Sequence, residues 1–206
     1  MDVIIIVIVL VFSAILHEVM HGFVADKLGD PTARIMGRLT LNPIPHIDPI
    51  GSIIMPLLTS LGGITFGWAK PVPINPLYFK DGRKDMALVA LSGPLTNFIL
   101  AIIGAIFFNI IPTDLILIKI IFYFIVRINL VLGILNLIPI PPLDGSKVFS
   151  IFLPDDLAKT YFSLEQYGTF ILLFLLFFPI GGINIGVFIS RLVIIAMQFL
   201  KVPLLF

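Results

Sequence analysis

Long apolar runs with few interruptions extend along the whole chain. A membrane-spanning helix needs about 20 mainly apolar residues, and residues 3–25 meet that length, with their polar residues confined to the second half. Residues 86–111 and 115–137 are also long enough, and the second of these runs carries Lys119 and Arg127. The three runs therefore predict three membrane-spanning helices.

Two other apolar regions are interrupted by residues that disfavour helices. Residues 50–68 contain one proline and four glycines among β-branched residues, so we expect a re-entrant or β-hairpin-like segment near 50–75. A proline and two glycines separate the runs at about 166–178 and 183–200, which predict two short spans or one broken span. We expect an all-α integral membrane protein with about five transmembrane helices, within a range of four to six, in one domain over residues 1–206.

Composition supports this membrane assignment and narrows the chemistry. Of the 206 residues, 59% are hydrophobic and 12% are charged, whereas a soluble domain has about 25% charged residues. The net charge is +1 and the basic residues are scattered, so we expect no nucleic-acid partner and a lipid bilayer as the surroundings. The chain has no cysteine, which means that a bound metal must be held by histidines and carboxylates.

The polar residues in the second half of the first run form a pattern with metal-ligand spacing. Residues 17–21 read His-Glu-Val-Met-His, and positions i and i+4 share one face of a helix, so His17 and His21 can bind one cation. Glu18 can take a proton from a metal-activated water. The alternative is that both histidines lie at a membrane interface and only hydrogen-bond to neighbours, but ionisable groups in a membrane helix are costly, which favours a functional site.

A catalytic zinc site needs a third protein ligand and keeps one position open for water. The candidates are Asp26, His46, Asp48 and Asp144. Asp144 is favoured because two prolines before it and a glycine after it break the helix at the end of a predicted span. Non-helical backbone at that depth must line a wet cavity or be buried in protein. Asp144 could also cap the following helix. His46 and Asp48 lie among prolines, which favours a rigid interfacial turn over a second metal site or a supporting role.

Counting the crossings indicates on which side of the membrane the site lies. If residues 50–68 do not cross, two crossings separate residues 17–21 from Asp144, so both reach the same side. Ten basic residues between Lys27 and Lys201 then also lie on that side, provided that both of the last two runs cross. The positive-inside rule makes this side cytoplasmic. We therefore expect the site in the cytoplasmic half of the membrane and the N-terminus outside.

Two motifs together resemble the site-2 protease family of intramembrane zinc metalloproteases. They are His17-Glu-Val-Met-His21 on an apolar helix and, far downstream, Asn136-Leu-Ile-Pro-Ile-Pro-Pro-Leu-Asp144-Gly. The stretches Leu41-Asn-Pro and Ser92-Gly-Pro-Leu-Thr-Asn97 are similar to the short bacterial and archaeal branch, which lacks PDZ and CBS domains. The resemblance covers a motif core over about residues 10–150 and leaves out the C-terminal helices at about 160–201.

The resemblance implies a metal site and a function. One zinc ion per chain would be held by His17, His21 and Asp144, and Glu18 would be the general base. The expected reaction is hydrolysis of peptide bonds in membrane-spanning protein substrates, as in regulated intramembrane proteolysis, in a multi-pass protein of a prokaryotic cell membrane. The alternatives are a metal-ion transporter, in which polar residues are typically spread along several helices, and an inactive zinc-binding scaffold, which has no need of Glu18.

Two asparagines are further candidates. The resemblance implies that Asn136 contacts the substrate backbone or orders the site. Asn97 lies in a predicted span and is either a hydrogen-bond anchor between helices or a residue of the site.

Overall fold

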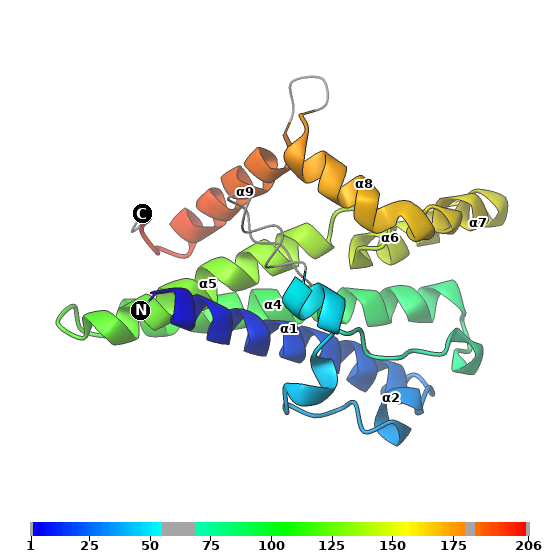
Figure 1. The fold of residues 1–206 in the computed structure, drawn as a ribbon, viewed down its shortest axis with the longest axis horizontal. Coiled ribbons are helices and arrows are strands. Elements are labelled where there is room, and N and C mark those ends of the chain that lie inside the picture. The colour runs from blue at the N-terminus through cyan, green and yellow to red at the C-terminus, as the bar shows by residue number, and fades with distance from the viewer. Residues whose placement is uncertain (1, 55–68, 180–183, 205–206) are drawn as a thin grey trace.

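Three long helices form the centre of the protein. The computed structural model describes residues 2–54, 69–179 and 184–204. Helices α1 (Asp2–Lys27), α4 (Arg83–Ile110) and α5 (Ile116–Asn136) are each long and apolar enough to cross a membrane. They run along the long axis of the molecule (Figure 1). The prediction of an all-α protein with long apolar helices at these three places is confirmed.

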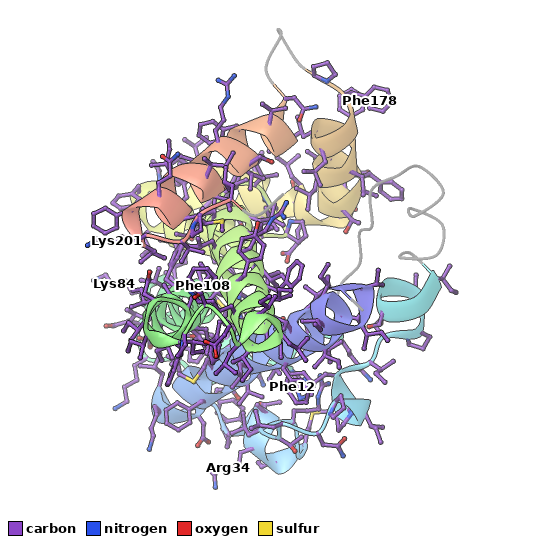
Figure 2. All side chains as sticks on the ribbon, turned by 90° about the vertical axis from the view of Figure 1, so that its left-hand side faces the viewer. Phe12, Arg34, Lys84, Phe108, Phe178 and Lys201 are labelled. Atoms are coloured by element: carbon purple, nitrogen blue, oxygen red, sulfur yellow. The ribbon has the colours of Figure 1, made fainter. Side chains whose placement is uncertain are left out.

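Small residues bring the long helices close together, with α4 packed against both α1 and α5. Ala101 and Ala105 of α4 are buried in an apolar cluster with residues of α5. Gly104 lies so close to α5 that a Cβ there would be 2.9 Å from the side chain of Ile125. Since lipid tails are as apolar as a protein core, such close packing is a main source of helix association in membranes. Phe108, Tyr123 and Phe124 are also buried in this cluster, whereas Phe178 is exposed (Figure 2).

Helices α8 (Glu165–Phe177) and α9 (Ile185–Phe199) have 13 and 15 residues, fewer than the roughly 20 that a full span needs. Figure 1 shows α8 running from the end of the molecule where α7 (Asp155–Ser163) lies to its middle, and α9 continuing to the end where both termini lie. The two helices together therefore extend along the bundle once. At its far end, the carbonyl of Leu200 accepts a hydrogen bond from Asn109 Nδ2 of α4, at 3.1 Å.

This arrangement corrects one prediction from the sequence. Lys201 was expected on the same side as the other basic residues, on the condition that both C-terminal runs cross. It lies instead beside the C-terminal end of α4, at the opposite end of the bundle from Lys27. The expectation is wrong because α8 and α9 make one traverse between them.

Short elements connect α1 to α4: α2 (Thr32–Ile35), η1 (Ile44–His46), η2 (Pro49–Ile54) and η3 (Pro76–Tyr78). The cyan η2 turn lies level with the middle of α1 in Figure 1, so the chain turns back along the bundle after leaving the end of α1. This part of the path agrees with the expected re-entrant segment. Residues 49–54 and 69–75 contain no strand, and most of the expected β-hairpin falls on residues 55–68, outside the described residues.

The chain after α5 is fastened to the start of α4. It forms α6 (Asp144–Phe149), η4 (Ser150–Phe152) and α7 (Asp155–Ser163). Arg83 donates hydrogen bonds to the carbonyls of Ser150, at 3.0 Å, and Leu153, at 2.8 Å, and forms an ion pair with Asp155. Tyr161 donates to the carbonyl of Pro139 at 2.7 Å, and its partial burial raises the pKa of its hydroxyl above 10.0, which keeps the proton in place. These contacts fix the chain on both sides of Asp144.

Candidate metal centre

His17 and His21 of α1 meet Asp144, the first residue of α6, inside the protein. The two Nε2 atoms are 3.0 Å apart, and Asp144 Oδ2 lies 3.0 Å from His17 Nε2 and 3.2 Å from His21 Nε2. All three residues are buried, with at most 9% of their surface exposed. In the part of the chain that the structure describes, they form the one group of histidines and acids close enough together to hold a metal ion.

Each imidazole makes a hydrogen bond through Nδ1, which points away from the other two residues of the group. This bond decides which nitrogen of the ring carries the proton. His21 Nδ1 lies 2.8 Å from the carbonyl oxygen of Val89, and a carbonyl can only accept, so Nδ1 carries the proton and Nε2 has a free lone pair. His17 Nδ1 lies 2.6 Å from Oδ1 of Asn97 and donates in the same way. Both imidazoles are therefore held in the tautomer that a metal needs at Nε2.

The resulting arrangement suits a cation. Two imidazole lone pairs and a carboxylate oxygen face one another in a buried space, and Asp144 Oδ2 has no hydrogen-bond donor among the described residues. Three acceptors at this spacing repel each other unless a positive charge lies between them. Tetrahedral zinc with bonds of about 2.0–2.1 Å places its ligands about 3.3–3.4 Å apart, close to the separations of 3.0 to 3.2 Å. The donor set therefore fits zinc.

Two glycines let the backbone approach this group. A Cβ on Gly93 of α4 would lie 2.5 Å from His21 Nε2 and 2.6 Å from His17 Cε1, so the helix packs directly on both imidazoles. A Cβ on Gly145 would collide with the main chain of Leu137, which means that the first turn of α6 presses against the end of α5. Glycine at these two positions brings α1, α4 and Asp144 to one point. The sequence pattern contained both residues but gave no indication of this role.

Glu18 is held at the edge of the group by main chain. Its Oε2 accepts a hydrogen bond from the N–H of Val72 at 2.8 Å. The extended segment 69–75 is fastened at two further points: Asp30 Oδ2 accepts from the N–H of Asn75 at 2.6 Å, and Arg38 donates to the carbonyl of Lys70 at 2.9 Å. Asp30 is fully buried. Oε2 of Glu18 is thus held by segment 69–75, which is in turn held by Asp30 and Arg38.

The two predicted asparagines lie in different places. Asn97 is fully buried and contacts His17 directly. Asn136, at the end of α5, donates from Nδ2 to the carbonyl of Leu132 in its own helix at 3.0 Å. The structure shows no hydrogen bond, in the described residues, from Asn136 to the two histidines or to Asp144. Its role toward a substrate stays a prediction.

The other candidates for a third ligand are bonded elsewhere. Asp26 forms an ion pair with Arg34 at 2.9 Å. His46 is buried, with Nε2 3.0 Å from the carbonyl of Thr40. Asp48 Oδ1 accepts from the N–H groups at the start of η2, at 3.0 Å from Ile50 and 2.6 Å from Gly51. The local bonding of His46 and Asp48 agrees with a rigid turn.

The fold and the site define a helical, membrane-type protein with a buried pair of histidines and a carboxylate able to hold a metal ion. The sequence profile of Peptidase family M50 matches residues 113–179. The chain is 38% identical over 186 residues to Putative zinc metalloprotease YwhC of Bacillus subtilis, a match that covers 85% of this chain and 81% of that protein. It belongs to peptidase family M50, which confirms the resemblance to the site-2 proteases.

A second relative is more distant. Putative zinc metalloprotease Rip2 of Mycolicibacterium smegmatis is 30% identical over 183 residues, covering 81% of this chain and 64% of that protein. No solved structure matches the chain.

Proposed function

We propose that the chain is a zinc metalloprotease that hydrolyses peptide bonds of membrane-spanning proteins within the bilayer. His17, His21 and Asp144 would hold one zinc ion, and Glu18 would be the general base. The observation that carries this proposal is the convergence of two correctly oriented imidazoles and a carboxylate oxygen within 3.0 to 3.2 Å. Family membership and the names of the relatives point to the same chemistry.

The depth of the site supports a substrate that lies in the membrane. His17 is ten residues before Lys27, the last residue of α1, and a helix rises 1.5 Å per residue, so the site lies about 15 Å inside that end. A peptide bond has to enter the bundle to reach it. The substrate class proposed here is therefore a membrane-spanning segment.

Different residues of the chain would have different roles in the hydrolysis. Zinc, when bound, supplies a positive charge that polarises the peptide carbonyl and lowers the pKa of a water molecule. Glu18 takes a proton from the attacking water and returns it to the departing amine. Its Oε2 is engaged by the Val72 N–H, so Oε1 is the oxygen that receives the proton. Asn97 and the Val89 carbonyl keep the two imidazoles in place while this charge moves.

Replacing Glu18 tests the proposal. Glu18→Gln keeps the shape of the side chain but removes the base, so cleavage of purified membrane-spanning peptides should fall by at least about 100-fold while bound zinc is retained. Glu165→Gln is the matched control, because Glu165 is the other glutamate and is exposed at the start of α8. A Glu18→Gln variant that still cleaves would disprove the mechanism. Zinc flux into vesicles without cleavage would favour a transporter.

The proposed orientation puts the site in the cytoplasmic half of a prokaryotic cell membrane. It is supported by the positive-inside rule and by basic residues such as Lys27 and Lys84 near the end of the bundle where α2 lies. The chain has no cysteine, so single cysteines can be introduced without removing others. A cysteine at exposed position Lys80 should react only with membrane-permeant reagents in intact cells, and one at Thr113 also with impermeant reagents. The reverse pattern would invert the orientation.

A further inference from the structure

We propose that Asn129 of α5 is a positioning residue that sets the tautomer of His17 without touching it. This inference rests on the proposed function where it concerns zinc. Asn129 Oδ1 accepts a hydrogen bond from Asn97 Nδ2 at 2.8 Å, and Asn97 Oδ1 in turn accepts from His17 Nδ1 at 2.6 Å. The two amides therefore form a relay from α5 through α4 to the imidazole on α1.

The direction of this relay is fixed at its far end. Asn129 Nδ2 lies 2.9 Å from the carbonyl oxygen of Ile125 and 2.9 Å from Ser13 Oγ. Because a main-chain carbonyl only accepts, the amide nitrogen of Asn129 must face Ile125, and its oxygen must face Asn97. That oxygen needs the nitrogen of Asn97, which leaves the oxygen of Asn97 facing His17. His17 then has to donate from Nδ1, and Nε2 keeps its lone pair.

Burial makes the relay effective. Asn97 is 0% exposed and Asn129 is 1% exposed, so water does not compete for either amide, and an unpaired amide there would be costly. Without the oxygen of Asn129, the side chain of Asn97 could rotate and present its nitrogen to His17 Nδ1. Nδ1 would then have to accept, and the proton would move to Nε2, the atom that faces Asp144 and His21. A protonated Nε2 cannot bind a metal.

The alternative is a purely structural role, in which the two amides only hold the three helices together, since polar side chains often form hydrogen bonds between membrane helices. The two explanations differ in what a remote substitution does. Asn129→Leu removes the relay and should weaken zinc binding by roughly 10- to 100-fold, as measured by competition with a chelator. Asn129→Asp in its neutral form keeps an acceptor for Asn97 and a donor for Ile125, so zinc affinity should stay within about threefold.

Two controls separate positioning from helix association. Asn109→Leu removes an amide that bonds α4 to the C-terminal end of α9, through Leu200, and should leave zinc affinity unchanged. Ser13→Ala removes one acceptor of Asn129 but leaves the Ile125 carbonyl, so it should also have little effect. If Asn129→Leu does not fold, Asn129→Ala tests the same step without adding an apolar side chain.

The tautomer itself gives a readout that needs no metal. Nitrogen NMR of the zinc-free protein labelled at its three histidines distinguishes a protonated Nδ1 from a protonated Nε2. His17 should be protonated at Nδ1 in the unmodified protein and in Asn129→Asp, and should shift toward Nε2 in Asn129→Leu. An Asn129→Leu variant with normal zinc affinity and an unchanged His17 spectrum would overturn the inference. A chain that binds no zinc would refute the proposed function, while the His17 spectra would still decide on the relay.

Discussion

The two histidines on α1 lie one helical turn apart but are oriented by different kinds of partner. His21 is held by the main-chain carbonyl of Val89, whose position is set by α4 and does not depend on the side chain at residue 89. His17 is held by the side chain of Asn97, which depends on a further side chain for its own orientation. The difference indicates that the loss of one side-chain amide can loosen His17 alone, whereas the hydrogen-bond acceptor of His21 can be removed only by moving the main chain of α4.

Gly93→Ala should break both orientations at once and have the largest effect. The added Cβ would lie 2.5 Å from His21 Nε2 and 2.6 Å from His17 Cε1, too close for either ring to stay in place. Zinc affinity should fall by at least about 100-fold, measured by competition with a chelator. Gly104→Ala is the control, because its Cβ would press on Ile125 of α5, away from the imidazoles. It should cost about 1–3 kcal/mol of stability and leave zinc affinity intact.

Asn97→Leu should separate the two histidines. The substitution removes the hydrogen-bond acceptor of His17 and leaves the contact of His21 with Val89. Zinc affinity should fall by roughly 10- to 100-fold, and nitrogen NMR should show a changed His17 beside an unchanged His21. If both histidine spectra changed together, the two supports would not be independent, and the comparison would be wrong.

Ser92→Ala should have the smallest effect. Ser92 Oγ donates to the same Val89 carbonyl that anchors His21, at 2.6 Å, and has only a long contact of 3.4 Å with His21 Nδ1. Removing this hydroxyl leaves the carbonyl and its bond to His21 Nδ1 in place, so zinc affinity should change by less than about threefold. Isothermal titration calorimetry with zinc would measure the affinity of the variant. A larger loss of zinc affinity would mean that the Val89 carbonyl holds His21 in place only with the help of the Ser92 hydroxyl.

The parts of the site that the sequence predicted are those with a local signature. The i, i+4 spacing brings His17 and His21 to one face, and the interruption of the helix around Asp144 marked the third member of the group. Among the residues that orient the rings, Asn97 was a candidate from the sequence, but the others have no such signature. Val89 acts through its carbonyl, which every residue has, and Asn129 looks like any polar residue in a span until the packing of three helices is known.

The fold was predictable to a similar extent. Run length was sufficient for α1, α4 and α5 because each exceeds the thickness of a bilayer by itself. The two C-terminal runs were too short for length to decide between two spans and one broken span. That choice depends on how α9 packs against α5 and α4, and it determined the side on which Lys201 lies.

The wide spacing of the site along the chain has a consequence for its biosynthesis. His21 and Val89 are 68 residues apart, and His17 and Asn97 are 80 apart. Because translation proceeds from the N-terminus, α1 enters the membrane before any partner of its imidazoles exists. Val89 and Asn97 follow with α4, then Asn129 with α5, and Asp144 comes last. If His17, His21 and Asp144 hold zinc as proposed, a nascent chain has no complete set of ligands until residue 144 has been added, and a half-inserted chain cannot act as a protease.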